Sequence, residues 1–406
     1  MAEAPMPAID AEVEDAYRLA PMQSDMLVHS ISSPRSGAYV QHAICDVREP
    51  LEPLRLEGAW QTVIERHTIL RTSFRIDRGP VQEVHRHVDV PWAYLDWRDL
   101  RPAERETRFD AYLEADRSRE LALERSPPMR LALLRLDEVH YRLLWTYHHA
   151  LLDGRSVHIV LREVFDRYDA LAAGRDLAFP VPRPYRAYIE WLERQDASGA
   201  EEFWRTALRG LAAPTRLPVE RPLSSTGKDD GWAMAELALQ RESTTALQRF
   251  SRERGLTLNT LLLGAWAQLL SRYSGETEVV FDTALALRGD RADELREIVG
   301  LCINTVPMRV RVEPEITLHE WLAGLRAQWL AMRPHAWLPL ASIHRASGIS
   351  YAERFGSSLV VFEHAPLDLL LHEDRKSWAT RAFARRSTPS HPLTLACFGG
   401  PELLLK

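Results

Sequence analysis

The sequence of 406 residues lacks several features that would place it in a familiar class of protein. Its only cysteines are Cys45, Cys302 and Cys397, an odd and scattered set that argues against a disulfide framework or a cysteine-based metal site. No apolar run reaches the ~18 residues that a membrane-spanning helix needs. Residues 1–16 have neither the basic start nor the apolar core of a signal peptide, and we expect them to form a mobile acidic leader.

An excess of positive charge is also absent. The formal net charge is -6, and a surface that binds nucleic acid needs clustered basic residues. We therefore expect a cytoplasmic protein with no nucleic-acid partner and no membrane partner.

The residues that are present indicate an α/β protein with two halves. Hydrophobic residues make up 46% and charged residues 27%, as in ordinary globular domains, and the length suggests two or three domains. Strand and helix patterns alternate on both sides of a proline-rich stretch at 177–184. We therefore expect one half over 17–176, a linker over 177–184 and a second half over 185–406.

The clearest elements of the first half are two strands and the helix that follows them. Met129–Leu136 and Tyr141–His148 are rich in apolar and aromatic residues, as buried strands are. Apolar residues recur at helical spacing after Gly154, and we expect Ser156 to cap that helix.

Two helices stand out in the second half. Residues 258–273 are apolar almost all round, which predicts a fully buried helix. Thr317 and Glu320 have the spacing of a capping box, and we expect Leu318 and Trp329 to face inward from the helix that they open.

The most informative motif is His148-His149-x-x-x-Asp153-Gly154, between the second strand and its helix. A metal site is one interpretation, but adjacent histidines on an extended segment point to opposite faces, so we expect no metal. A buried structural pair of histidines is another. General base catalysis is the third, because a neutral imidazole with a pKa near 6.5 accepts protons at neutral pH.

The sequence offers a base but no covalent nucleophile. Residues 154–158 match a serine-hydrolase elbow in part, yet the closing glycine is absent. No phosphate-binding glycine loop is present either. A base without a nucleophile suits direct acyl transfer between two bound substrates.

Motifs spread over most of the chain resemble those of the condensation domains of nonribosomal peptide synthetases, in the acyltransferase superfamily of chloramphenicol acetyltransferase. Five segments match in family order, with the active-site motif in the middle: Leu19–Leu27, Arg66–Phe74, His148–Ser156, Tyr188–Leu192 and Ile298–Thr305. The resemblance implies two chloramphenicol acetyltransferase-like lobes, 17–176 and 185–406, in a V-shaped pseudo-dimer. It also implies further elements at the C-terminus, so we expect a truncated C-terminal lobe.

The resemblance implies a role for each residue of the motif. His149 would be the catalytic residue that orients or deprotonates the acceptor amine, and His148 would pack behind the turn. Asp153 would either be the third member of a catalytic triad or, as the family pattern favours, pair with Arg288 and brace the site. Gly154 would adopt a backbone geometry closed to other residues and present its N–H to the developing oxyanion.

Asn304 is a further candidate, either as a polar group between the lobes or as an asparagine satisfied within a loop.

The function implied is amide bond formation between a carrier-bound acyl thioester and a carrier-bound amine. The implied partners are donor and acceptor peptidyl carrier proteins, with an adenylation domain adjacent. No cofactor would be bound by the domain itself, since carriers deliver phosphopantetheine arms. Ester formation, a free-standing acyltransferase, epimerisation and a non-catalytic recruitment domain remain alternatives.

Overall fold

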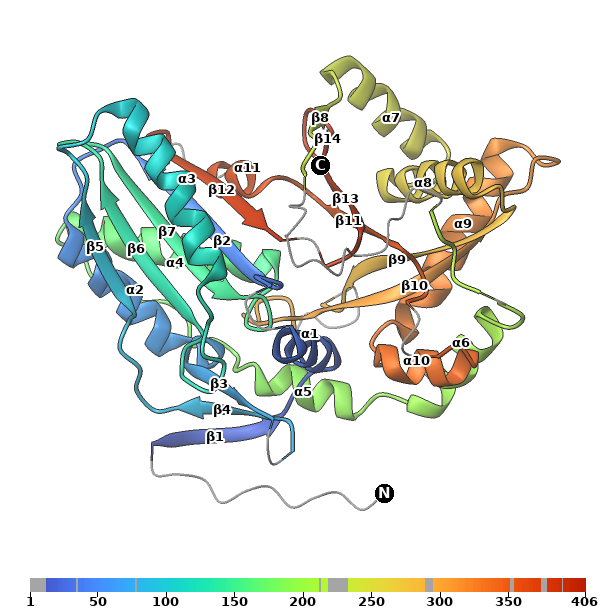
Figure 1. Cartoon of the computed structure of the whole chain (residues 1–406), viewed down its shortest axis with the longest axis horizontal. Helices are drawn as coiled ribbons and strands as arrows, with labels where there is room; N and C mark the ends of the chain where they lie inside the picture. The colour runs from blue at the N-terminus through green and yellow to red at the C-terminus, as the bar shows by residue number, and fades with distance from the viewer. Residues whose placement is uncertain are drawn as a thin grey trace, which may run out of the picture. The chain divides into compact units, whose positions relative to one another are not determined.

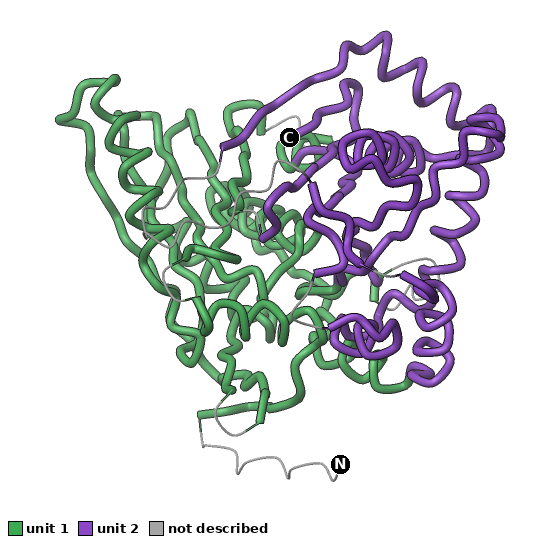
Figure 2. The backbone as a smooth tube through the Cα atoms, turned by 45° about the vertical axis from the view of Figure 1, so that its right-hand side comes forward, with its two compact units in different colours: residues 1–194, 288–302, 367–388 green, residues 195–287, 303–366, 389–406 purple. Residues whose placement is uncertain are grey.

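The computed structural model divides into two compact units (Figure 2). Unit 1 comprises Met1–Arg194, Arg288–Cys302 and Leu367–Thr388, and unit 2 comprises Gln195–Leu287, Ile303–Pro366 and Pro389–Lys406. The structure describes residues 12–33, 36–76, 79–211, 213–217, 233–288, 295–350, 354–373, 378–388 and 390–406.

Unit 1 is built on a five-stranded sheet in the order β12-β2-β7-β6-β5 (Figure 1). Antiparallel pairs join β12 to β2, β2 to β7 and β7 to β6, while β5 and β6 run parallel. The strands are β2 (Val40–Val47), β5 (Trp92–Asp96), β6 (Met129–Arg135), β7 (Tyr141–His148) and β12 (Arg381–Ser387). The two strands expected around residues 129–148 are confirmed.

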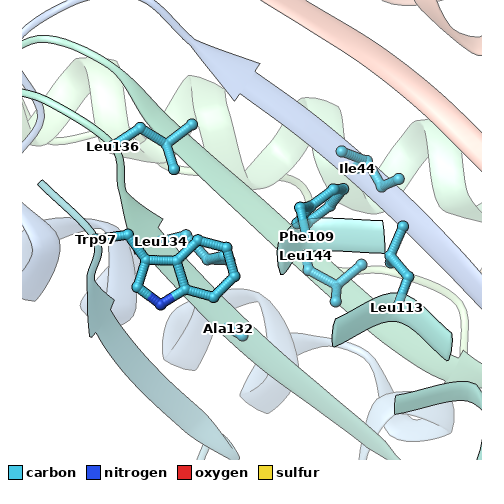
Figure 3. Packing of buried hydrophobic residues seen from close by; sticks show 8 residues of the cluster. All are labelled: Ile44, Trp97, Phe109, Leu113, Ala132, Leu134, Leu136 and Leu144. Carbon is cyan, nitrogen blue, oxygen red and sulfur yellow. The ribbon is translucent and has the colours of Figure 1, made fainter. Parts of the chain in front are cut away.

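Helices cover both faces of this sheet. On one face α3 (Pro102–Ser118) packs Phe109 and Leu113 against Ile44 and Leu144 of neighbouring strands (Figure 3). On the other face lie α2 (Pro53–Arg66) and α4 (Gly154–Ala172), where the rings of Trp60 and Trp145 meet at 4.8 Å. Because both faces of the sheet are covered, most residues of β2, β6 and β7 are buried whichever face they point to.

Unit 1 also contains a small antiparallel sheet in the order β1-β4-β3. It contains β1 (Val13–Arg18), β3 (Thr72–Arg75) and β4 (Val81–His85), and β4 pairs antiparallel with both of the other strands. The expectation of a mobile leader over 1–16 is wrong for residues 13–16, which pair with β4; residues 1–11 lie outside the described residues. Burial of Val13 and Ala16 accounts for this strand, and its acidic Asp15 pairs with Arg186.

Other α-helices also belong to unit 1. They include α1 (Pro21–Ser32), α5 (Arg186–Glu193) and α11 (Leu367–His372).

Unit 2 has a six-stranded sheet in the order β10-β9-β11-β13-β14-β8. Its strands are β8 (Leu237–Ala238), β9 (Glu278–Ala286), β10 (Ile303–Arg311), β11 (Ser358–Glu363), β13 (Leu393–Phe398) and β14 (Leu404–Leu405). Its helices are α6 (Ala197–Ala207), α7 (Arg241–Glu253), α8 (Leu258–Ser274), α9 (Leu318–Met332) and α10 (Leu340–Ser347). Both units thus combine strands with helices, and the expected α/β class is confirmed.

The helices of unit 2 confirm one expectation and contradict two. The capping box of α9 is confirmed, since Thr317 Oγ1 accepts the Glu320 N–H at 3.2 Å. However, Leu318 is 59% exposed and does not face inward. Helix α8 is not fully buried either, because Leu269 and Tyr273 lie on an exposed face. Apolar side chains alone do not fix burial, since much of a protein's surface is apolar.

The compact units also differ from the expected halves. Residues 177–184 have no regular secondary structure, as a linker would, but α5 beyond them belongs to unit 1. Two segments of the second half, 288–302 and 367–388, belong to unit 1 as well, and β12 supplies its edge strand. No local pattern in the sequence predicts that these two distant segments pack within unit 1.

None of the helices in the described part of the chain has the length and apolar character needed to cross a membrane.

Candidate active site

The motif of two histidines occupies the turn that joins β7 to α4 within unit 1. His148 is the last residue of β7, and two backbone bonds, Leu151 N–H to His148 and Leu152 N–H to His149, tighten the turn. Asp153 then caps α4 by accepting the Ser156 N–H at 3.0 Å. The prediction that Ser156 is the N-cap is therefore wrong: the aspartate carboxylate takes that role.

The ring of His149 is held in one tautomer. Its Nδ1 lies 2.7 Å from the carbonyl oxygen of Leu152, which can only accept a hydrogen bond, so Nδ1 carries the proton. Nε2 is then the unprotonated nitrogen, and no described residue hydrogen-bonds to it. A neutral imidazole with a free Nε2 lone pair has the form that a general base requires.

The surroundings of His149 also favour its neutral form. The side chain is mostly enclosed yet remains partly accessible. Burial lowers its pKa below the ordinary 6.5, and the positive charge of Arg385 acts in the same direction, against the hydrogen bond to Leu152. The ring of His149 is therefore neutral at pH 7, with Nε2 unprotonated.

His148 is buried, and both nitrogens of its ring are hydrogen-bonded. It is 3% exposed, and its Nδ1 accepts the Ala150 N–H at 3.1 Å, which leaves Nε2 to donate to Ser30 Oγ at 3.0 Å. Burial, with a smaller contribution from His149, lowers its pKa from 6.5 to about 3. His148 therefore stays neutral and holds the turn against α1.

The Asp153 carboxylate binds Arg288, whereas the Nδ1 of His149 binds the Leu152 carbonyl. Asp153 Oδ2 accepts from Arg288 Nη1 at 2.5 Å and from the Cys302 N–H at 2.9 Å. Burial by itself would raise the pKa of Asp153, but the charge and hydrogen bond of Arg288 outweigh it and keep that pKa below the ordinary value. Asp153 braces the turn as an ion, and the expected pairing with Arg288 is present in the structure.

Ser156 and Gly300 complete this buried network, and the sequence motif did not single out either as a site residue. Ser156 Oγ donates to the Gly300 carbonyl at 2.7 Å and accepts the Gly300 N–H at 2.9 Å. Arg288 Nη2 reaches both, at 2.7 Å to Ser156 Oγ and 3.0 Å to the Gly300 carbonyl. The first turn of α4 is thus fixed to segment 295–302 of the same unit.

Two candidates have a different setting from the one expected. Gly154 is the first residue of α4 and is not among the described glycines with positive φ, so its backbone geometry is open to other residues. Asn304 lies in β10 of unit 2 rather than in a loop, where its Nδ2 donates to the carbonyls of Ala336 at 2.8 Å and Leu338 at 2.9 Å.

We expect Gly300→Ala to destabilise the protein by ~1–3 kcal/mol, the usual cost of overpacking. A Cβ at Gly300 would overlap Cδ2 and Cε2 of Tyr185, whose ring is buried and whose hydroxyl is fixed by the Leu301 carbonyl at 2.7 Å. Denaturant unfolding measures the change.

Gly58→Ala is the matched control. No atom lies within 4 Å of a Cβ at this position in α2, so that variant should gain stability by ~0.5–1 kcal/mol. A Gly300→Ala protein as stable as the Gly58→Ala protein would contradict the close packing of Tyr185 on segment 295–302.

With the site described, comparison with known proteins assigns the family. The model of the Condensation domain family matches residues 13–390. This chain belongs to the condensation domain family. Condensation domains of nonribosomal peptide synthetases are acyltransferases, the chemistry expected from the sequence.

Curated relatives are subunits of large synthetases. The chain is 36% identical over 399 residues to one of the linear gramicidin synthase subunits of Brevibacillus parabrevis, covering 98% of this chain and 5% of that protein. It is 31% identical over 367 residues to surfactin synthase subunit 3 of Bacillus subtilis (strain 168), covering 89% of this chain and 28% of that protein. The chain therefore spans a small part of the length of these relatives.

Solved structures share the fold of this condensation domain. The starter condensation domain of rhizomide synthetase superposes with a TM-score of 0.76 at 20% identity, covering 96% of this chain and 88% of that one. The first condensation domain of the calcium-dependent antibiotic synthetase, in complex with a substrate analogue, gives 0.75 at 20% identity, with 97% and 90% covered.

Proposed function

We propose that this condensation domain forms an amide bond between an acyl thioester donor and an amine acceptor, with His149 as the general base. The observation that carries the proposal is the bond from His149 Nδ1 to the Leu152 carbonyl at 2.7 Å. It leaves Nε2 unprotonated on a partly accessible ring.

In the proposed reaction the acceptor nitrogen attacks the thioester carbonyl carbon while Nε2 takes a proton from that nitrogen. The C–N bond forms, the C–S bond breaks, and the imidazolium returns the proton to the leaving sulfur. Aminolysis of a thioester is already downhill, so the site has to position the reactants and remove a proton.

Asp153 is assigned a supporting role in this proposal. A catalytic triad would need a hydrogen bond between the carboxylate and His149, but both Asp153 oxygens are used by other groups, Oδ1 by Ser156 and Oδ2 by Arg288 and Cys302. The carboxylate instead fixes the start of α4, and with it the turn that presents His149.

Both substrates would arrive on phosphopantetheine arms of peptidyl carrier proteins, with an adenylation domain activating the acyl group. Support comes from the relatives, which are synthetase subunits. The proposal also includes the arrangement of two chloramphenicol acetyltransferase-like lobes as a pseudo-dimer, for which the shared fold of the solved condensation domains is the support.

The test of this proposal compares two donors with the same acyl group, one on a carrier protein and one on a short soluble thiol. We expect a kcat/KM at least tenfold higher for the carrier-bound donor, because tethering raises the effective concentration to the millimolar range. Mass spectrometry of the product identifies the new amide. Equal kcat/KM for the two donors would instead indicate a free-standing acyltransferase, and an ester product would contradict the amine acceptor.

A further inference from the structure

Tyr39, directly before β2, has an unusual backbone. Its φ is +62°, and it is the only residue other than glycine with a positive φ among those that the structure describes. L-residues pay a steric cost in this left-handed region, whereas glycine does not. Such a conformation persists only where its surroundings hold it, and it is frequent at functional sites.

The ring of Tyr39 is held by two histidines. It meets His29 edge-on with centroids 5.5 Å apart, and it lies 6.3 Å from the ring of His148. His148 is itself fixed, through Ser30 and Ala150, in the turn that carries the catalytic histidine. The ring contacts therefore keep a residue other than glycine in the left-handed region.

The carbonyl of Tyr39 contacts the catalytic residue directly. It accepts the His149 N–H at 2.8 Å. This bond lies directly next to Val40 and His148, the terminal pair of residues between β2 and β7. His149 then has two anchors, its backbone N–H on Tyr39 and its Nδ1 on Leu152. Together they fix the direction of the Cα–Cβ bond and the orientation of the ring.

We propose that Tyr39 is a positioning residue for His149: its left-handed backbone aims the carbonyl at the His149 N–H. This inference rests on the function proposed above. Losing one of the two anchors would let the imidazole drift, and small misplacements of a catalytic group are costly.

The test is a series of variants at position 39. Its critical comparison is between glycine, which adopts a positive φ easily but is small, and alanine, which is larger but disfavours a positive φ. Tyr39→Phe keeps the ring contacts and should keep kcat within about twofold. Tyr39→Gly and Tyr39→Asn tolerate a positive φ and should lose less than about threefold in kcat. Tyr39→Ala loses the ring without that tolerance, and its kcat should fall about tenfold or more with KM little changed.

If Tyr39 acted through packing alone, Tyr39→Ala would have a higher kcat than Tyr39→Gly, since alanine fills more space than glycine. Tyr94 in β5 is the matched control, because this tyrosine is 42% exposed and its φ is not positive. At this strand position Tyr94→Ala should be more stable than Tyr94→Gly, and neither variant should change kcat.

Hydrogen exchange at the His149 amide tests the inference without any assay of activity. Its protection should survive in Tyr39→Gly and fall at least tenfold in Tyr39→Ala. If both variants protect this amide equally, or if alanine is the better residue for both protection and kcat, Tyr39 does not position His149. If exchange follows the expected order but His149 variants remain active, the positioning is correct and the proposed function is wrong.

Discussion

His149→Asn should lower the turnover of carrier-bound substrates by about 10²–10⁴-fold, the range that a general base contributes. The asparagine amide can still donate to the Leu152 carbonyl, so the turn is preserved while the base is removed. The melting temperature should therefore change little. Single-turnover kinetics measure the loss, and thermal unfolding measures the stability.

His148→Asn should show the opposite pattern. His148 is buried between Ser30 and Ala150, and removing its ring costs packing and a hydrogen bond without removing the base. We expect a lower melting temperature and a turnover much closer to the unchanged protein than that of His149→Asn. Normal turnover in His149→Asn would disprove the catalytic assignment.

Asp153→Ala and Arg288→Ala should each lower the free energy of unfolding by ~3–5 kcal/mol, because each leaves a buried charge without its partner. Asp153 is 2% exposed and Arg288 is 7% exposed. The double variant should lose less than the sum of the singles, by ~0.5–3 kcal/mol, since neither charge is then left alone. Denaturant unfolding of the four proteins gives this coupling.

The adjacent pair Arg155 and Glu297 provides the control for this cycle. Its ion pair, 2.9 Å long, joins the same two segments, but the side chains are 49% and 66% exposed. A surface pair contributes ~0–1 kcal/mol at most, so both single variants and their coupling should be small. Additive losses for Asp153 and Arg288 would mean that the two side chains do not meet.

The local part of this site could be predicted from the sequence. The strand Tyr141–His148 is rich in apolar and aromatic residues, apolar residues recur at helical spacing after Gly154, and the motif lies at their junction. The pairing of Asp153 with Arg288 came from the family resemblance, because 135 residues separate the two positions and no local pattern links them.

Other parts of the site depend on contacts that no local pattern encodes. β2 is buried on both faces, so it lacks the alternation that identifies a strand. β12 contains three arginines in seven residues and has the composition of a surface loop, yet it pairs along β2. The left-handed backbone of Tyr39 follows from its place between His29 and His148 in the folded unit.

The protonation state of His149 tests its role as the general base most directly, measured by nitrogen NMR of the imidazole and assigned by comparison with His149→Asn. We predict a neutral ring with the proton on Nδ1 near pH 7. Because burial disfavours the imidazolium, its titration midpoint should lie below 6.5, so the base form is lost only as the pH falls through that lowered value. A proton on Nε2, or an imidazolium at neutral pH, would contradict the assignment of His149 as the general base.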